Sequence, residues 1–171
     1  MAREGSLDYE RFELIEGALI PKVPKSHPHS VVLVVLLEWL QRHFRGRRVA
    51  PSAIDVRPED NPINEPEPDL IVLTGPIDRL KRRPQPQDVL LVVEISDTTL
   101  AFDLVVKARL YARAGIPEYW VADINGAKIF AHRNPSPGGY GSVTTYSVDD
   151  RIAPLAAPDA EIQVGELLTA K

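Results

Sequence analysis

The stretch VLLVVEISDTTLAFDLVVKARLYARAG, residues 89–115, decides the fold of this 171-residue chain. Residues 89–95 are apolar apart from Glu94, which is the pattern of a strand buried on both faces of a sheet. The next four residues, SDTT, are good helix N-cap residues. Residues 100–114 carry apolar side chains at helical spacing, and Gly115 is suited to end a helix. The stretch therefore predicts a central strand followed by a helix.

Elements of both kinds are predicted on either side of this stretch. Residues 12–20 predict a tight hairpin whose turn is Glu16-Gly17, since glycine reaches positive φ without steric cost. After a loop over 21–28, the apolar run 31–37 extends too far for a strand, so residues 29–44 predict a buried helix. The remaining predicted elements are strands at 48–56, 69–73 and 118–123, a hairpin from 128–132 and 140–147, and a short closing element at 164–168. Helices and strands share one core around a mixed sheet, so the fold is α/β or α+β.

Length and composition limit the classes of protein. The length indicates one domain, residues 1–171, and the 44% hydrophobic and 26% charged content is ordinary for a globular protein. The absence of cysteine excludes disulfides, thiolate zinc sites, iron–sulfur clusters and a cysteine nucleophile. The longest apolar run has seven residues where a membrane span needs about 20. Because residues 1–6 also lack a signal-peptide pattern, we expect a cytoplasmic protein with no membrane partner.

The charge distribution leaves two interpretations open. A net charge of −4 argues against a globally basic nucleic-acid-binding domain. Eight of the twenty basic residues nevertheless fall into two clusters, which either contact nucleic-acid phosphates or form a solvated surface. The clusters consist of Arg42, Arg45, Arg47 and Arg48, and of Arg79, Lys81, Arg82 and Arg83.

Two carboxylates in predicted strands are candidates for chemistry. Asp69 begins one strand and Glu94 lies near the end of another, so antiparallel pairing of these strands would bring the two together at one sheet edge. Clustered carboxylates in a partly dry site repel each other unless a cation lies between them. Mg²⁺ takes oxygen ligands and is often held by one or two carboxylates plus a substrate phosphate. The alternatives are that Asp69 is a turn residue and that Glu94 pairs with an arginine.

Simple geometry places Lys107 near the same point. Beyond Glu94 the strand runs on about 10 Å at 3.3 Å per residue. The helix then returns about 12 Å to Lys107 at 1.5 Å per residue. If the helix packs antiparallel on the sheet, Lys107 lies level with Glu94, and Asp103 and Tyr111 share its helix face. The alternative is an ordinary surface ion pair between Asp103 and Lys107.

Other familiar sites are missing from the sequence. The pair His27 and His29 has no third ligand at metal spacing, so a zinc site is not expected, and a histidine just before a helix, such as His29, is more often a cap or packing residue than a ligand. Neither a glycine-rich phosphate loop nor a G-x-S-x-G elbow occurs.

Several motifs together resemble a known family. Over about residues 8–133 they follow the order of the Uma-two family, which belongs to the PD-(D/E)xK restriction-endonuclease-like nucleases. The motifs are FELIEG at 12–17, His29, PDL at 68–70, VEIS at 93–96, Asp103 with Lys107 and Tyr111, and GIPEYW at 115–120 with Asp123. The resemblance implies a restriction-endonuclease-like core, a central mixed β-sheet flanked by helices, with an N-terminal hairpin and C-terminal β additions.

The resemblance also implies Mg²⁺- or Mn²⁺-dependent cleavage of phosphodiester bonds. Asp69 matches the metal-binding aspartate of the family and Glu94 the second acid. Ser96 stands where the superfamily pattern has its lysine, and Lys107 fits the position to which this family has moved it. We therefore expect Asp69, Glu94 and the Ile95 carbonyl to hold the metal, with Lys107 acting on the attacking water. Residues expected to line the site are His29, Glu13, Ser96, Asp103 and Tyr111.

Three functions remain open on the sequence. The first is a metal-dependent endonuclease acting on DNA, expected as a homodimer because cutting two strands often uses two copies of a site. The second is a non-catalytic nuclease-fold protein that binds nucleic acid or a partner protein, with Asp69, Glu94 and Lys107 as a buried polar network. The third is a metal-dependent hydrolase of a smaller phosphoester.

Overall fold

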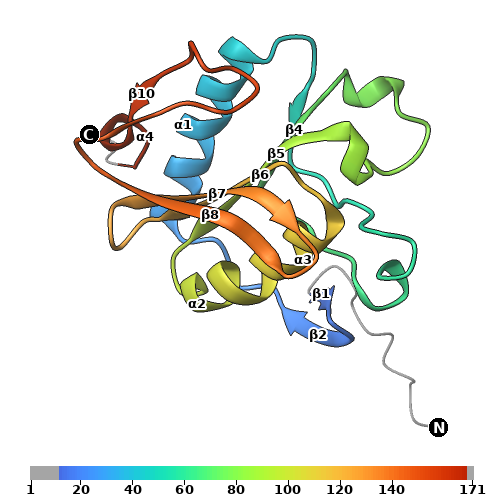
Figure 1. Ribbon diagram of the computed structural model, residues 1–171. Helices are drawn as coiled ribbons and strands as arrows, with labels where there is room; N and C mark the ends of the chain where they lie inside the picture. Colours follow the sequence, from blue (N-terminus) through green and yellow to red (C-terminus); the bar gives the residue numbers. More distant parts are fainter. Residues whose placement is uncertain (1–11, 169–171) are drawn as a thin grey trace, which may run out of the picture.

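A six-stranded mixed sheet forms the centre of the computed structural model, which describes residues 12–168 (Figure 1). Its strand order is β3-β4-β5-β6-β7-β8. Only β5 and β6 pair in parallel, and every other pair of neighbours is antiparallel. The strands are β3 Val49–Ala50, β4 Leu70–Leu73, β5 Val89–Ser96, β6 Glu118–Asp123, β7 Lys128–Ser136 and β8 Gly139–Ser147. The predicted mixed α/β fold is confirmed.

Helices cover the two faces of this sheet. Helix α1, His27–His43, lies on one face, and the predicted 100–114 helix lies on the other, as the crossover that a parallel pair such as β5–β6 requires. The second helix has three segments, α2 Leu100–Phe102, a π-helical turn Asp103–Lys107 and α3 Ala108–Ala114. It ends at Gly115, whose φ of 83° is the left-handed conformation expected of a C-cap glycine.

The hydrophobic interior has two layers where the sequence predicts one shared core. Trp39 and Trp120 lie in the layer under α1, and Tyr111 and Tyr119 in the layer under α3. The division follows from β4, whose residues are all buried, because alternate side chains of a strand point to opposite faces. The sheet thus separates the layers, and the face under α3 is the one that Glu94 shares.

Smaller elements complete the fold. The predicted N-terminal hairpin is confirmed as β1 Phe12–Ile15 and β2 Ala18–Pro21, with positive φ at both turn residues, 51° at Glu16 and 78° at Gly17. The C-terminal part forms β9 Arg151–Ile152, β10 Ile162–Gln163 and the predicted closing element as α4 Val164–Leu168. Short 3-10 turns occur at Asn61–Ile63, Ile77–Arg79 and Pro86–Asp88.

Two predicted boundaries are wrong for local reasons. The strand expected over 48–56 is paired only at β3, because Pro51 has no N–H to continue the ladder. The chain beyond it bonds elsewhere, with Ile54 N donating to the Pro66 carbonyl. Helix α1 begins two residues before the predicted position, because Ser26 caps it by accepting from the His29 N–H at 3.3 Å. Within residues 12–168, no helix is long and apolar enough to cross a membrane.

Candidate active site

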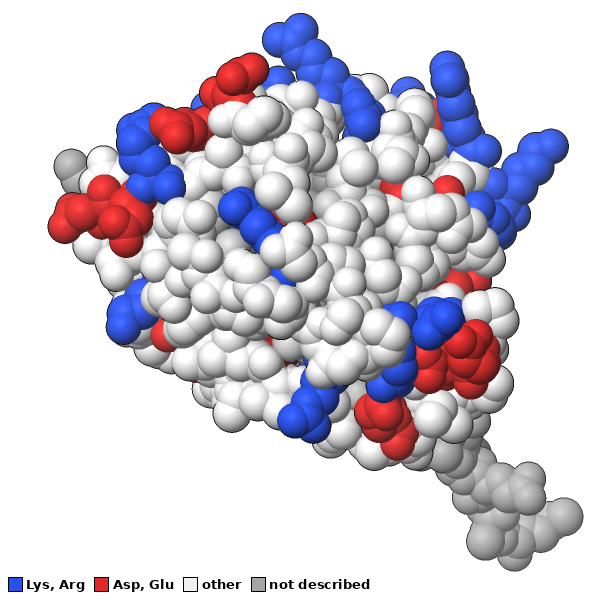
Figure 2. All heavy atoms as spheres, viewed as in Figure 1, with Lys and Arg blue, Asp and Glu red and all other residues white. Residues whose placement is uncertain are grey.

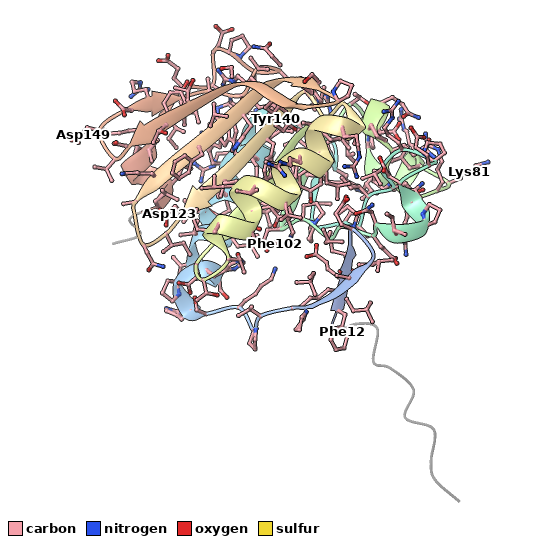
Figure 3. All side chains as sticks on the ribbon, turned by 60° about the horizontal axis from the view of Figure 1, so that its bottom comes forward. Phe12, Lys81, Phe102, Asp123, Tyr140 and Asp149 are labelled. Carbon is pink, nitrogen blue, oxygen red and sulfur yellow. The ribbon has the colours of Figure 1, made fainter. Side chains whose placement is uncertain are left out.

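A cavity of about 630 Å³ opens beside the ends of β4 and β5. Its walls come from the β1–β2 hairpin, the loop leading into α1, and the segment from α2 through the π-helical turn. Phe102 of α2 is one of the lining residues, and Figure 3 labels it on the side of the molecule where the helix faces the hairpin. Six acidic side chains and three lysines line the cavity, and the inner group among them is Glu13, Asp69, Glu94, Asp103 and Lys107.

The pairing of β4 with β5 brings Asp69 to Glu94. The strands are antiparallel with Leu70 opposite Val93, so the start of one lies beside the end of the other, as predicted. Asp69 Oδ2 accepts a hydrogen bond from the Ile95 N–H at 2.9 Å. Leu70, which follows Asp69, and Val93 and Ile95, which flank Glu94, all face α1. Because successive side chains of a strand point to opposite faces, both carboxylates lie on the α3 side of the sheet. The predicted meeting of the two acids is confirmed, and Glu94 pairs with Lys107 instead of an arginine, while Asp69 lies in a bend directly before β4.

Lys107 reaches both Glu94 and the N-terminal hairpin. Its Nζ lies 2.9 Å from Glu94 Oε1 and 3.0 Å from Glu13 Oε2. The side chain is 7% exposed, which rules out a surface ion pair with Asp103. The predicted level of Lys107 beside Glu94 is therefore confirmed, and Glu13, 94 residues away in sequence, joins the same contact.

A π-helical turn carries Asp103 and Lys107 into the cavity wall. The Ala108 N–H bonds to the Asp103 carbonyl five residues earlier, and both end residues of the turn are buried. Such widened turns occur frequently at functional sites. Asp103 does not pair directly with Lys107, because its Oδ2 accepts from the Thr99 hydroxyl at 2.6 Å. The turn thus places a third carboxylate near the ammonium without forming an ion pair.

Tyr111 and Ser96 were expected to line the site, but both are fully buried and lie behind the residues that line the cavity. The Tyr111 hydroxyl donates to Glu94 Oε1 at 3.1 Å, so this oxygen receives two donors. Ser96 is fully buried, and its Oγ lies 3.4 Å from the Thr99 hydroxyl. Ser96 therefore supports the residues around Asp103, while Tyr111 holds one oxygen of Glu94.

Asp69 is held by two cationic or ionisable side chains as well as by backbone. His29 Nε2 lies 3.1 Å from Oδ2, and the Lys25 ammonium lies 2.9 Å from Oδ1. Burial raises the pKa of Asp69, but the bonds from His29, Ile95 and Lys25 outweigh it and hold the pKa below its ordinary value. Asp69 is therefore ionised at neutral pH.

The pKa of Glu94 is shifted in the opposite direction to that of Asp69. Burial raises its pKa, the nearby Lys107 ammonium lowers it, and the carboxylates of Asp69 and Glu13 raise it further, so the pKa lies above its ordinary value. For Lys107, burial lowers the pKa, but Glu94 and Glu13 outweigh burial and keep the ammonium charged. The cluster holds more acidic groups than cations, and a further cation would relieve that imbalance.

The carboxylate oxygens fit a hard divalent cation. Glu94 Oε2 has no hydrogen-bond partner among the residues that the structure describes, and Asp69 Oδ1 is held only by the half-exposed Lys25. Oxygen donors of this kind suit Mg²⁺ or Mn²⁺, with water and substrate phosphate completing the coordination. Within residues 12–168, no group of three or more His, Asp or Glu side chains is arranged to hold a metal.

Part of one predicted basic cluster lies beside the segment that carries the other, while Arg83 pairs with Glu65, which is bridged to Leu14 of the N-terminal hairpin. The Ile77 N–H donates to the Arg47 carbonyl at 3.0 Å and Arg47 pairs with Asp78, so the end of α1 lies beside the β4–β5 connection. We call the eight residues of the two clusters the basic rim. Figure 2 shows Lys and Arg side chains at the top and upper right of this face, and Figure 3 places Lys81 at the edge of the molecule, far from Phe102. A phosphate-binding role of the rim stays a prediction.

Lys25 is a site residue that the sequence analysis missed. It lies in the proline-rich loop between β2 and α1, next to the capping Ser26, where no periodicity or motif marks it. Its importance comes only from its contact with Asp69, 44 positions further along the chain. Lys22 of the same loop pairs with Glu67 at 2.7 Å on the cavity wall.

The mixed sheet with a helix on each face has a restriction-endonuclease-like nuclease fold, and the carboxylate–lysine cluster lies at one edge of that sheet. The solved structures include one that superposes with a TM-score of 0.68 at 15% sequence identity, covering 92% of this chain and 89% of the other. It is described as a "putative nuclease belonging to DUF820" from Anabaena variabilis ATCC 29413. At that identity the likeness concerns the fold alone.

The family follows from the sequence match. The model of the Uma2 family, described as "Putative restriction endonuclease", matches residues 5–165. The chain belongs to this family, and the resemblance stated above is confirmed. None of the curated proteins searched matches the chain.

Proposed function

We propose that this protein is a divalent-metal-dependent endonuclease that hydrolyses phosphodiester bonds in DNA. The observation that carries the proposal is the position of Lys107, whose ammonium lies 2.9 Å from Glu94 in the cavity that Asp69 also lines. Two carboxylates and a lysine around one cavity are the groups that metal-assisted phosphodiester hydrolysis uses. Membership of a family described as "Putative restriction endonuclease" supports the same chemistry.

Asp69, Glu94 and the Ile95 carbonyl would hold Mg²⁺ or Mn²⁺. When bound, the ion supplies polarisation of the phosphate and a lowered pKa for a coordinated water. The chain's own contribution is a charged ammonium, held between Glu13 and Glu94, that orients the attacking water and stabilises developing negative charge. Tyr111 and His29 keep the two carboxylates in place through the hydrogen bonds at Glu94 Oε1 and Asp69 Oδ2.

Nicking of supercoiled plasmid in Mg²⁺ or Mn²⁺ tests the proposal. We expect the wild type to nick and Asp69→Asn and Lys107→Met to lose the activity. Glu67→Gln is the matched control. Glu67 also lines the cavity, but its side chain pairs with Lys22 and not with Lys107. Equal nicking by all four proteins would identify a contaminating nuclease and contradict the proposal.

Calorimetric titration of Mn²⁺ separates the alternatives. If the wild type binds Mn²⁺ and nicks neither plasmid nor single-stranded DNA, the fold serves binding alone or acts on a smaller phosphoester, which an aryl phosphodiester substrate would reveal. If the wild type binds no Mn²⁺, both metal-dependent functions fail.

The assembly and location of the protein are part of the same proposal. We propose a homodimer, because cleavage of both DNA strands often uses two copies of a site, and a cytoplasmic location, where DNA is available. Size-exclusion chromatography with light scattering checks the first, and a clean monomer at micromolar concentration would contradict it.

A further inference from the structure

Lys25 occupies the oxygen of Asp69 that a metal ion would need. Asp69 Oδ2 already accepts from the Ile95 N–H at 2.9 Å and contacts His29 Nε2 at 3.1 Å. Oδ1 remains, and the Lys25 ammonium lies 2.9 Å from it. An ammonium and a dication repel each other at contact distance, so the two cannot share Oδ1.

The surroundings of Lys25 allow it to leave. Its side chain is 49% exposed while Asp69 is 11% exposed, so the ion pair is formed from the solvent side of the cavity. Because the lysine end of the pair is half-exposed, water can solvate the ammonium as it leaves, and the flexible four-carbon side chain of lysine lets the charge move. The buried Lys107 is different in kind, because its side chain is 7% exposed and fixed by two carboxylates.

We propose that Lys25 is an exchangeable cation of the active site. In the metal-free protein it neutralises Asp69, and when the metal binds it is displaced and contacts the phosphate of the DNA substrate. Released from Asp69, the ammonium stays tethered at the cavity mouth by the β2–α1 loop, close to where the scissile phosphate meets the metal. This inference rests on the proposed function and adds a substrate-binding residue outside the motifs quoted above.

Mn²⁺ calorimetry without DNA tests the displacement. Lys25→Met removes the competing charge, so we expect it to bind Mn²⁺ about three- to tenfold more tightly than the wild type. Lys25→Arg keeps a cation on the loop and should restore affinity close to that of the wild type. Lys22→Met is the matched control, because Lys22 lies in the same loop but pairs with Glu67 instead of Asp69. Equal or weaker Mn²⁺ binding by Lys25→Met would overturn the inference.

Substrate affinity tests the phosphate contact. At saturating Mn²⁺, Lys25→Met should raise KM for plasmid about five- to tenfold. The slope of the logarithm of DNA affinity against the logarithm of salt concentration should become shallower by the amount expected for one lost phosphate contact. Tighter Mn²⁺ binding with an unchanged KM would overturn the contact with phosphate.

The failure of this inference is distinguishable from that of the proposed function. A wild type that binds Mn²⁺ but does not cut leaves the calorimetric comparison intact, and DNA affinity by fluorescence anisotropy then replaces KM. A wild type that binds no Mn²⁺ overturns both. A wild type that cuts while Lys25→Met matches it in metal and DNA affinity overturns the role of Lys25 alone.

Discussion

Two glutamates on neighbouring strands of the sheet are both buried, and their surroundings differ completely. Glu118 of β6 is fully buried, with Oε1 accepting from Trp120 Nε1 and from Arg133 and Oε2 accepting from the Leu155 N–H. Glu94 of β5 is 5% exposed, with two donors on Oε1 and none on Oε2 from the described residues. One carboxylate has a donor for each oxygen, and the other keeps an oxygen open toward a cavity.

The difference shows how one residue type serves structure or chemistry. Around Glu118, Arg133 supplies two N–H groups and a positive charge, so the buried carboxylate is compensated. Around Glu94, the Lys107 charge is shared with Glu13, and Asp69 lies nearby. The uncompensated carboxylate is the one that can take up a cation.

The largest expected effect is on catalysis. Glu94→Gln should lower plasmid nicking in Mn²⁺ about a thousandfold, because it removes a charged ligand at the reacting centre. Glu118→Gln makes the same chemical change at the other glutamate and should leave the rate of the folded protein within about threefold of wild type. Equal losses in the two variants would remove the distinction between the sites.

The next expected effect is on stability, where Glu118→Gln should be the more damaging of the two variants. Glu118→Gln breaks a buried pair and should lower the free energy of unfolding by about 3 kcal/mol, or Tm by roughly 6–12 °C for a chain of this length. Glu94→Gln should shift Tm by less than about 3 °C, since it also relieves repulsion among carboxylates. Differential scanning calorimetry of the metal-free proteins checks both values, and a Glu94→Gln protein as unstable as Glu118→Gln would contradict the comparison.

A third prediction concerns pH. The pKa of Glu94 is raised in the folded protein, so the folded state binds this proton more tightly than the unfolded chain. Its contribution to stability is therefore present at low pH and is lost as pH rises through the folded pKa. Because a dication binds the ionised carboxylate, Mn²⁺ affinity should increase with pH, approaching tenfold per unit where one proton is released.

Calorimetry in buffers of different ionisation enthalpy measures that proton release. Glu67→Gln should behave as the wild type does, since Glu67 does not contact the Glu94 cluster through its side chain. Mn²⁺ affinity that stays constant between pH 6 and pH 8.5 would show that Glu94 does not titrate with metal binding.

The smallest effect is expected at the basic rim. Helix α1 has 17 residues, about 25 Å of helix, with His29 at the cavity end and Arg42 of the rim in the last turn. The double variant Arg79→Ala with Lys81→Ala should weaken DNA binding a few-fold, equally for all sequences, and reduce its salt dependence, with kcat unchanged. A fall in kcat measured in saturating DNA would instead connect the rim to the chemistry.

Much of the candidate site could be predicted because it depends on local periodicity. The strand β5 and the helix after it follow from apolar spacing, and the rise per residue of strand and helix then places Lys107 beside Glu94. Asp69 joins them through one further assumption, the antiparallel pairing of β4 with β5. The π-helical turn at Asp103–Lys107 has no such signal, because it changes the hydrogen-bond spacing without changing which residues are apolar.

By itself the sequence determined the strands, the helices, the family and the acid–acid–lysine set, since each rests on patterns within short segments. Only the tertiary structure decided that Glu13 shares Lys107 with Glu94 and that Lys25 sits on Asp69. It also decided that Arg47, beyond the end of α1, lies beside Ile77 and Asp78 of the β4–β5 connection. These contacts join segments that are far apart in the chain, and their geometry is fixed by how the hairpin, the loop and the helices pack around the sheet, which no local pattern encodes.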